Sequence, residues 1–301
     1  MSRVYVFNQY GGPQGEELIE RPIPEPGPGD LLVEVRAAGV NPVDWKIREG
    51  HLGTDEELPV AMGREVAGVV AAIGPGIQEY AVGDEVLGLV GPGQGGWADH
   101  TLMRAADVVA KPEEISFAVA ALIPVAGTTA YDLTHAIELR AGQTLLVLGA
   151  GGGVGHLVAE IGRVHEFRVL GVASGRHRAL VESTGATFVG TGEGVVSAVH
   201  ELAREGVDLI VDLVGGQLLR DMAPLAKAPH LIISAPDPET ATELGGSGRT
   251  YDPESLAKIT SVIGFKVITP QISGKYPLAR AREALAAVES RHAHGKIVIV
   301  P

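Results

Sequence analysis

The chain of 301 residues contains no cysteine, which excludes disulfides and every metal site built on thiolate ligands. Aromatic residues make up only 4% of it, whereas glycine occurs 41 times, so we expect aliphatic packing and many tight turns. The chain also lacks an excess of basic residues, because its formal net charge is −13. A chain this acidic binds nucleic acids and anionic membranes poorly, since like charges repel. We therefore expect no nucleic-acid partner and no membrane partner.

Two further absences concern location. No basic and apolar leader opens the chain, and we expect no apolar run long enough to span a bilayer. A cytoplasmic protein is the resulting expectation. The length suits two domains rather than one.

The most informative stretch runs from residue 144 to residue 178. An apolar run is stopped there by a cluster of glycines, apolar residues then recur at helical spacing, and a second apolar run follows at 168–173. A strand, glycine turn, helix and strand in this order predict a pyrophosphate site, because the first N–H groups of a helix lack intrahelical partners. The alternative is a glycine-rich turn that binds nothing. The residues expected at the pyrophosphate are Ala150, Gly151, Gly152, Gly153 and Val154.

The segment after the second of these strands favours NADPH over NADH. Selectivity for NAD usually uses an Asp or Glu about 20 residues after the glycines. The corresponding segment here is Ser174-Gly175-Arg176-His177-Arg178, and the next carboxylate is Glu182. A hydroxyl and two guanidinium groups suit a 2′-phosphate, which arginine can bind through two parallel hydrogen bonds. The alternative is that both arginines only solvate the start of a helix.

The pattern of the chain changes near residue 116. Before it, short strands are separated by glycine and proline, which is typical of a small barrel-like β module. After it, strands and helices alternate, which predicts a parallel, doubly wound sheet with its ligand edge at the carboxyl ends of the strands. Beyond the sheet we predict a loop over 236–252, a strand over 265–272, an amphipathic helix over 278–290 and a closing strand over 296–300.

Several dispersed stretches resemble the quinone oxidoreductase (zeta-crystallin-like) branch of the medium-chain dehydrogenase/reductase superfamily. The resemblance implies an α/β fold with two domains and an active cleft between them. Residues 1–121 and 263–301 would form a GroES-like β-barrel domain, and residues 122–262 a Rossmann domain with a doubly wound parallel sheet. The matching stretches include Ala-Ala-Gly-Val-Asn-Pro-Val-Asp at 37–44, Gly-Arg-Glu-Val-Ala-Gly at 63–68, Gly-Thr-Thr-Ala-Tyr at 127–131, Val-Asp-Leu-Val-Gly-Gly at 211–216 and Gly-Lys-Ile-Val at 295–298.

Zinc-dependent relatives have a cysteine near position 41 and Gly-His-Glu at positions 63 to 65. This chain has Asn41 and Gly-Arg-Glu at those places, so we expect no bound metal. We interpret His292 and His294, the one close histidine pair, as solvated side chains. Without a Lewis acid, the feasible chemistry is hydride donation to an acceptor that is already electron-poor.

The resemblance also implies roles for single residues. Asn41 resembles the family position near the nicotinamide ribose and the acceptor, where it would serve in positioning. Thr128 resembles the threonine that orients the nicotinamide. Trp45 would either line the substrate pocket or simply be buried. Asp44 is expected to cap the helix that follows Pro42.

The remaining roles concern the two ends of the cofactor. Ser174 and Arg178 resemble the serine and lysine that hold the 2′-phosphate, with arginine in place of lysine. Val214 and Ala235 resemble the loops around the nicotinamide ring.

Together these features predict a zinc-independent, NADPH-dependent reductase that transfers hydride to quinones or α,β-unsaturated carbonyls. Its partner would be a small electrophilic acceptor. We expect a homodimer, although segment 244–251, an apolar strand in relatives, is a poor strand in this chain. Two alternatives stay open: a biosynthetic enoyl reductase with one tightly held substrate, and a non-catalytic sensor that binds NADPH.

Overall fold

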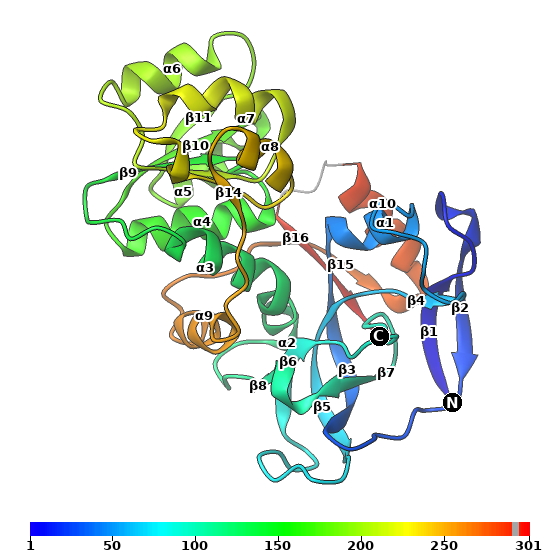
Figure 1. Cartoon of the computed structure of the whole chain (residues 1–301). Coiled ribbons are helices and arrows are strands. Elements are labelled where there is room, and N and C mark those ends of the chain that lie inside the picture. Colours follow the sequence, from blue (N-terminus) through cyan, green and yellow to red (C-terminus); the bar gives the residue numbers. More distant parts are fainter. Residues whose placement is uncertain (291–294) are drawn as a thin grey trace. The chain divides into compact units, whose positions relative to one another are not determined.

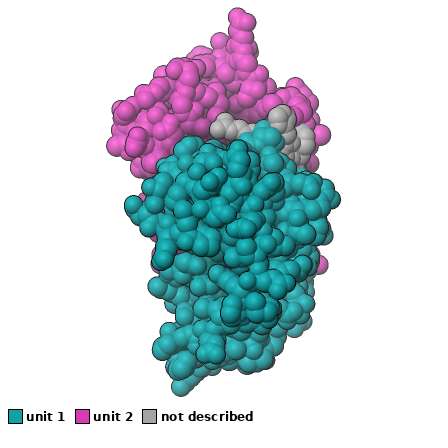
Figure 2. All heavy atoms as spheres, turned by 90° about the vertical axis from the view of Figure 1, so that its right-hand side faces the viewer, with its two compact units in different colours: residues 1–125, 263–265, 272–301 teal, residues 126–262, 266–271 magenta. Residues whose placement is uncertain are grey.

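The structure is a computed structural model that describes residues 1–290 and 295–301 (Figure 1). The histidine pair His292 and His294 lies outside the described residues. The chain folds into two compact units, coloured separately in Figure 2. Unit 1 comprises residues 1–125, 263–265 and 272–301, and unit 2 comprises residues 126–262 and 266–271. The sequence had suggested divisions after residues 121 and 262.

Unit 1 is a β module with two sheets. Its larger, seven-stranded sheet runs in the order β15-β16-β3-β5-β6-β8, and β7 pairs with β3. The long strand β3 is central because β5, β7 and β16 all pair with it antiparallel. The strands of this sheet are β3 (Asp30–Val40), β5 (Glu65–Ile73), β6 (Glu85–Leu89), β7 (His100–Arg104), β8 (Val108–Ala110), β15 (Ile272–Pro277) and β16 (Lys296–Val300).

The smaller sheet of unit 1 has the order β2-β1-β4. Its strands are β1 (Ser2–Phe7), β2 (Glu16–Arg21) and β4 (Val60–Ala61). Trp97 is fully buried in the core of the unit and donates a hydrogen bond from Nε1 to the carbonyl of Gly39 at 3.0 Å. The helices of the unit are α1 (Pro42–Arg48), α2 (Phe117–Ala120) and α10 (Ala281–Glu289), with 3₁₀ turns at η1 (Pro13–Gly15), η2 (Ala105–Asp107) and η7 (Leu278–Arg280).

Unit 2 is a six-stranded sheet in the order β11-β10-β9-β12-β13-β14, and every neighbouring pair is parallel. Renumbered from its first strand, the order is the 3-2-1-4-5-6 of a doubly wound dinucleotide-binding sheet, which confirms the predicted α/β class. The order reverses between β9 and β12, so the carboxyl ends of these strands border the expected ligand crevice. The strands are β9 (Thr144–Leu148), β10 (Arg168–Ala173), β11 (Thr187–Gly190), β12 (Leu209–Asp212), β13 (Ile232–Ser234) and β14 (Ser247–Gly248).

The helices of unit 2 alternate with these strands. The apolar side chains of β9 are fully buried between them, as expected for a central strand covered on both faces. The helices are α3 (Thr128–His135), α4 (Gly153–Val164), α5 (Arg178–Ser183), α6 (Val195–Leu202), α7 (Gly216–Met222), α8 (Pro238–Glu243) and α9 (Ser255–Gly264), whose last two residues belong to unit 1, with short turns at η4 (Gly175–His177), η5 (Ala223–Leu225) and η6 (Pro229–Leu231). The π-helical turn η3 (Ile123–Gly127) precedes α3 and contains the point in the chain where unit 1 passes into unit 2.

Two segmental predictions are wrong. The segment 236–252 contains α8 and β14 rather than a loop: the carboxylate of Asp237 caps α8 by accepting from the Thr240 N–H at 3.1 Å. The segment 265–272 forms no strand, and β15 begins only at its last residue. Phe265 is 82% exposed, and Lys266 has a φ of 57°, which breaks an extended chain.

The expectation that no apolar run reaches membrane-spanning length does not hold for one stretch of the described residues. Among the described residues, the helical stretch Phe117–His135 is long and apolar enough by length and composition. It consists of α2, η3 and α3, and 78% of its most apolar window is buried inside the fold. Burial of this kind is typical of a core helix, whose apolar side chains serve packing.

Candidate functional site

The glycine turn between β9 and α4 leaves little space for side chains. A Cβ on Gly155 would overlap the carbonyl oxygen of Gly149, so glycine is required where the helix meets the strand. A Cβ on Gly151 would lie 2.5 Å from Cγ of His177, so this imidazole packs directly against the turn. The N–H of Ala150 donates to the carbonyl of Val172 at 3.0 Å, which fixes the turn on β10.

The backbone donors for an anion lie at the start of α4. Gly152 is the N-cap of this helix and contributes no side-chain cap. The N–H groups of Gly153 and Val154 are therefore at the positions that lack intrahelical acceptors. Those N–H groups and the positive end of a 12-residue helix fit a pyrophosphate. The predicted turn thus has the backbone geometry that a dinucleotide needs.

The segment after β10 holds the residues predicted to select NADPH. The hydroxyl of Ser174 lies 2.9 Å from Nδ1 of His177. Arg176 is exposed on η4. Arg178 begins α5, pairs with Glu182 at 3.0 Å, and stacks its guanidinium over the ring of Phe188 at 4.3 Å. The side chains of Arg178 and Glu182 are both at least half exposed, so this pair is weak and leaves the guanidinium accessible to a phosphate.

The loops predicted around the nicotinamide are both held by Asp212, which ends β12. Its Oδ1 accepts from the N–H groups of Val214 at 3.0 Å and Gly215 at 2.9 Å. Its Oδ2 accepts from the hydroxyl of Ser234 at 2.6 Å, and the N–H of Ala235 donates to its carbonyl at 3.1 Å. Val214 is 47% exposed. The fold therefore presents Val214 and Ala235 side by side at the carboxyl edge of the sheet.

Thr128, the first residue of α3, is joined to this edge by Arg249. The guanidinium donates to the hydroxyls of Thr128 at 3.1 Å and Thr129 at 2.7 Å, and it pairs with Asp132 at 2.7 Å. Arg249 directly follows β14, and its N–H donates to the carbonyl of Ser234 at 3.1 Å. The predicted nicotinamide-orienting threonine thus has its hydroxyl fixed by a cation from the far end of the sheet.

Asn41 lies in unit 1 within a buried polar cluster. Its Nδ2 donates to Oε1 of Glu65 at 2.7 Å, and its Oδ1 accepts from Nζ of Lys296. Lys296 also lies 3.6 Å from Oε1 of Glu65, whose Oε2 accepts from the N–H of Val125 at 2.7 Å. Asp44 accepts from the N–H of Asn41 at 2.7 Å, which confirms the predicted helix cap. Asn41, Asp44, Glu65 and Lys296 are all buried.

Burial controls the protonation of the two carboxyl groups in this cluster. Desolvation raises the pKa of Asp44 to about 7, opposed by the Asn41 N–H and reinforced by the charge of Glu65. The atom Oδ1 of Asp44 is buried without a hydrogen-bond partner, which agrees with the neutral acid. Desolvation also raises the pKa of Glu65, against the opposing effects of Lys296 and Asn41.

Trp45 follows Asp44 in α1 and is half-buried. Its ring packs edge-to-face against His51 at 5.7 Å and against the core of unit 1. Burial and a pocket-lining role are both compatible with this placement, so the assignment of Trp45 stays a prediction.

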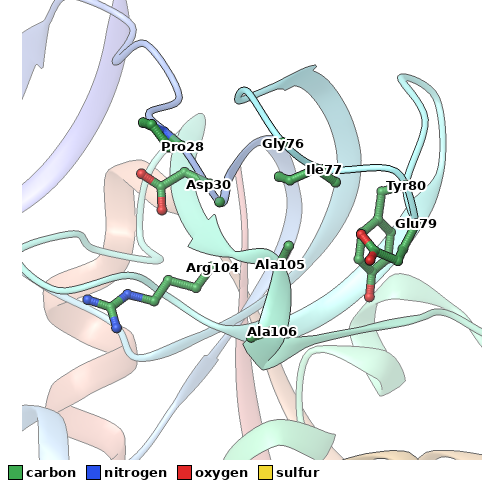
Figure 3. A pocket seen from close by; sticks show the side chains of 10 residues that line it. Pro28, Asp30, Gly76, Ile77, Glu79, Tyr80, Arg104, Ala105 and Ala106 are labelled. Carbon is green, nitrogen blue, oxygen red and sulfur yellow. The ribbon is translucent and has the colours of Figure 1, made fainter.

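A separate hollow of about 800 Å³ lies in unit 1 between the start of β3, the segment 76–80 and η2 (Figure 3). Arg104 lines it together with two acidic residues, Asp30 and Glu79. None of the residues predicted to bind cofactor or substrate lines this hollow. It therefore adds nothing to the candidate site.

No role was predicted from the sequence for several residues of the site, among them Glu65, His177, Asp212, Arg249 and Lys296. Asp212 and Lys296 lie within the stretches 211–216 and 295–298, where a polar residue at the end of an apolar strand was a usable signal. Nothing in the sequence around Arg249 indicates its contact with α3. Within residues 1–290 and 295–301, no three His, Asp or Glu side chains cluster in a way that could hold a metal ion.

Comparisons with known proteins find similarity to dehydrogenases and reductases in both parts of the chain. Residues 27–113 match the family described as the alcohol dehydrogenase GroES-like domain, and residues 184–299 match the family described as zinc-binding dehydrogenase. The chain is 31% identical to the chloroplastic NADPH-dependent alkenal/one oxidoreductase of Arabidopsis thaliana, over 99% of this chain and 79% of that protein.

Solved structures of similar proteins have the same fold. The quinone oxidoreductase of Coxiella burnetii superposes with a TM-score of 0.89 at 26% identity, covering 100% of this chain and 99% of that one. A mycobacterial protein solved in complex with NADPH superposes with a TM-score of 0.88 at 26% identity, and both chains are covered completely. Unit 1 is therefore the expected GroES-like domain, and unit 2 the Rossmann-like domain.

Proposed function

Because the chain belongs to the medium-chain dehydrogenase/reductase superfamily, in its quinone oxidoreductase branch, we propose that it is an NADPH-dependent reductase of quinones or α,β-unsaturated carbonyls. Its membership of this family identifies the chain as an oxidoreductase. The choice of NADPH and the class of acceptor are the parts that we propose.

One observation carries the proposal: the carboxyl edge of the sheet in unit 2 brings together the helix start after the glycine turn, the two loops held by Asp212 and the basic segment after β10. The helix start after the glycine turn receives the pyrophosphate, and the Asp212-braced loops with Val214 and Ala235 border the nicotinamide. Ser174, Arg176 and Arg178 at the end of β10 receive the 2′-phosphate, with Glu182 the nearest carboxylate in sequence. NADPH supplies a hydride from its reduced ring when it is bound.

We propose that the reaction uses no metal. The chain has no thiolate to offer, and the cluster around Asn41 contains the ammonium of Lys296, which repels a second cation. Quinones and enones need less electrophilic help than simple ketones, because delocalisation stabilises the anion that hydride addition produces. The protein's part is then to orient the acceptor and to exclude water.

An acceptor screen tests the proposal. Loss of nicotinamide absorbance is followed with NADPH and with NADH against 1,4-benzoquinone, 9,10-phenanthrenequinone and a series of 2-alkenals. We expect turnover with several of these acceptors and a preference for NADPH. NADPH binding without turnover on any acceptor would favour a sensor, and activity confined to one enoyl substrate would favour a biosynthetic reductase.

We also propose a homodimer in the cytoplasm. The dimer is what the family resemblance implies. Light scattering coupled to size exclusion tests the dimer, and a monomer at all concentrations would contradict it.

A further inference from the structure

The side-chain amide of Asn41 lies between two opposite charges. Its Oδ1 accepts from the ammonium of Lys296, and its Nδ2 donates to the carboxylate of Glu65 at 2.7 Å. Rotating the amide by half a turn would place its N–H on the ammonium and its oxygen on the carboxylate. Both contacts would be repulsive, and both charged groups would lose a hydrogen bond inside a buried cluster. The amide therefore has one orientation.

The two charged neighbours are themselves fixed. Glu65 is fully buried, and its second oxygen accepts from the N–H of Val125 at 2.7 Å. A Cβ on Gly39 would overlap Oε1 of Glu65, so glycine at this position makes room for the carboxylate. Lys296 is 6% exposed, and its ammonium also donates to the carbonyl of Val40 at 3.3 Å. The amide is consequently held by partners that cannot easily move.

This arrangement decides what Asn41 can offer to a ligand. Lys296 donates to one of the two lone pairs of the amide oxygen, and Glu65 accepts from one of the two N–H groups. The second N–H of Nδ2 has no protein partner within the described part of the chain. The ammonium withdraws electron density from Oδ1 and makes this oxygen a poorer acceptor, so the remaining N–H is the stronger group that the amide offers.

We propose that Lys296 is a positioning residue which, together with Glu65, fixes the orientation of the Asn41 amide, so that its remaining N–H binds an acceptor oxygen of the ligand. The proposal rests on the proposed function, because that function supplies the two candidate atoms. One is a ribose hydroxyl oxygen of NADPH, and the other is the carbonyl oxygen of the quinone or enone. Because Oδ1 of Asn41 accepts from an ammonium, its remaining N–H is polarised and becomes a stronger donor.

The test uses Lys296→Met, the charge-preserving Lys296→Arg, and Lys275→Met as a matched control. Lys275 is an exposed lysine on β15, the strand beside β16. We expect Lys296→Met to lower kcat/KM by about tenfold or more, as the loss of one polarised donor does. Lys296→Arg should recover most of this loss, and Lys275→Met should behave as the wild type.

A double-mutant cycle separates positioning from a merely structural role. In the Asn41→Ala background, Lys296→Met should cost nothing further, because the group that it positions is gone. An equal loss in both backgrounds would overturn the proposal. The dissociation constant of NADPH without acceptor identifies the ligand atom: it rises in Lys296→Met if Asn41 binds the ribose, and stays constant while kcat falls if Asn41 binds the acceptor.

A measurement on the wild-type protein covers the case in which Lys296→Met does not fold. The side-chain amide protons of Asn41, assigned against Asn41→Ala, should shift downfield in NMR spectra when NADPH or 9,10-phenanthrenequinone is added. No shift with either compound would overturn the proposal. This readout needs no turnover, so an inactive enzyme whose Asn41 signal still shifts with NADPH would contradict the proposed function and leave the donor role intact.

Discussion

The hydroxyl of Ser234 donates a hydrogen bond of 2.6 Å to the carboxylate of Asp212, and the two residues are direct partners at the ends of the parallel strands β12 and β13. Both side chains are fully buried. The same carboxylate also accepts from the N–H groups of Val214 and Gly215. It therefore contacts both the loop after β12 and the end of β13. The geometry of the two loops that we propose to border the nicotinamide therefore depends on a residue that is itself shielded from solvent.

Replacing Asp212 by Asn should weaken cofactor binding. One of its two acceptor oxygens is lost, so either the loop N–H groups or the Ser234 hydroxyl remain without a partner, at a cost of about 1–3 kcal/mol. We expect a lower melting temperature and a dissociation constant for NADPH that rises on the order of tenfold. Isothermal titration measures the latter. Asp221→Asn, on the exposed face of α7, is the control, and an Asp212→Asn variant that binds like this control would refute the role of Asp212.

Removing the charge of Arg249 should destabilise unit 2. The carboxylate of Asp132 has only 1% of its side chain exposed and would be left buried without its guanidinium partner. Loss of one partner of a buried pair costs about 3 kcal/mol or more. We expect Arg249→Met to unfold at a lower urea concentration than the wild type, measured at the midpoint of the unfolding transition.

The same experiment has an internal control. Arg249→Met combined with Asp132→Asn should recover part of the stability, because no unpaired charge remains. If the double variant is no more stable than Arg249→Met alone, the ion pair does not explain the effect.

Cofactor preference should respond to Arg178. Arg178→Ala removes a guanidinium from the proposed 2′-phosphate site, and we expect the ratio of kcat/KM for NADPH over NADH to fall about tenfold. Glu182→Gln removes the carboxylate that competes for Arg178 at 3.0 Å, so this variant should keep or increase the ratio. Arg204→Ala, at an exposed position after α6, provides the control. A ratio that stays constant in Arg178→Ala would argue against the assignment.

Stability should fall with rising pH because of Asp44. Burial raises its pKa to about 7 from 3.8, so the folded state binds this proton more tightly than the unfolded state does. The stabilisation is complete below about pH 4 and is lost as the pH rises through 7, with a total on the order of a few kcal/mol.

Asp44→Asn stays neutral at every pH and can still accept from the N–H of Asn41. We therefore expect a shallower decline of the urea midpoint between pH 5 and pH 8 than in the wild type, with Glu65 responsible for the remaining slope. Asp55→Asn, in an exposed loop, should follow the wild type. A wild-type and an Asp44→Asn profile of equal slope would show that Asp44 does not titrate in this range.

Local features were predictable wherever neighbours in sequence decide them. The glycine turn and the helix after it follow from backbone sterics and apolar periodicity, and the cap made by Asp44 depends on a residue only three positions away. The segments that were predicted wrongly depend instead on contacts with residues far away in the sequence. Residues 265–271 are apolar enough for a strand, but the N–H of Thr269 donates to the carboxylate of Glu160 instead of to a neighbouring strand.

The sequence by itself determined the class of fold, the glycine turn and the basic segment after β10, because periodicity, glycine sterics and local charge act over short distances along the chain. Only the tertiary structure decided what surrounds Thr128 and Asn41. Their partners Arg249 and Lys296 lie 121 and 255 residues away, and no local pattern specifies them. The physical reason is desolvation: once the fold removes water from these polar groups, each must find a partner from whichever strand end lies nearby.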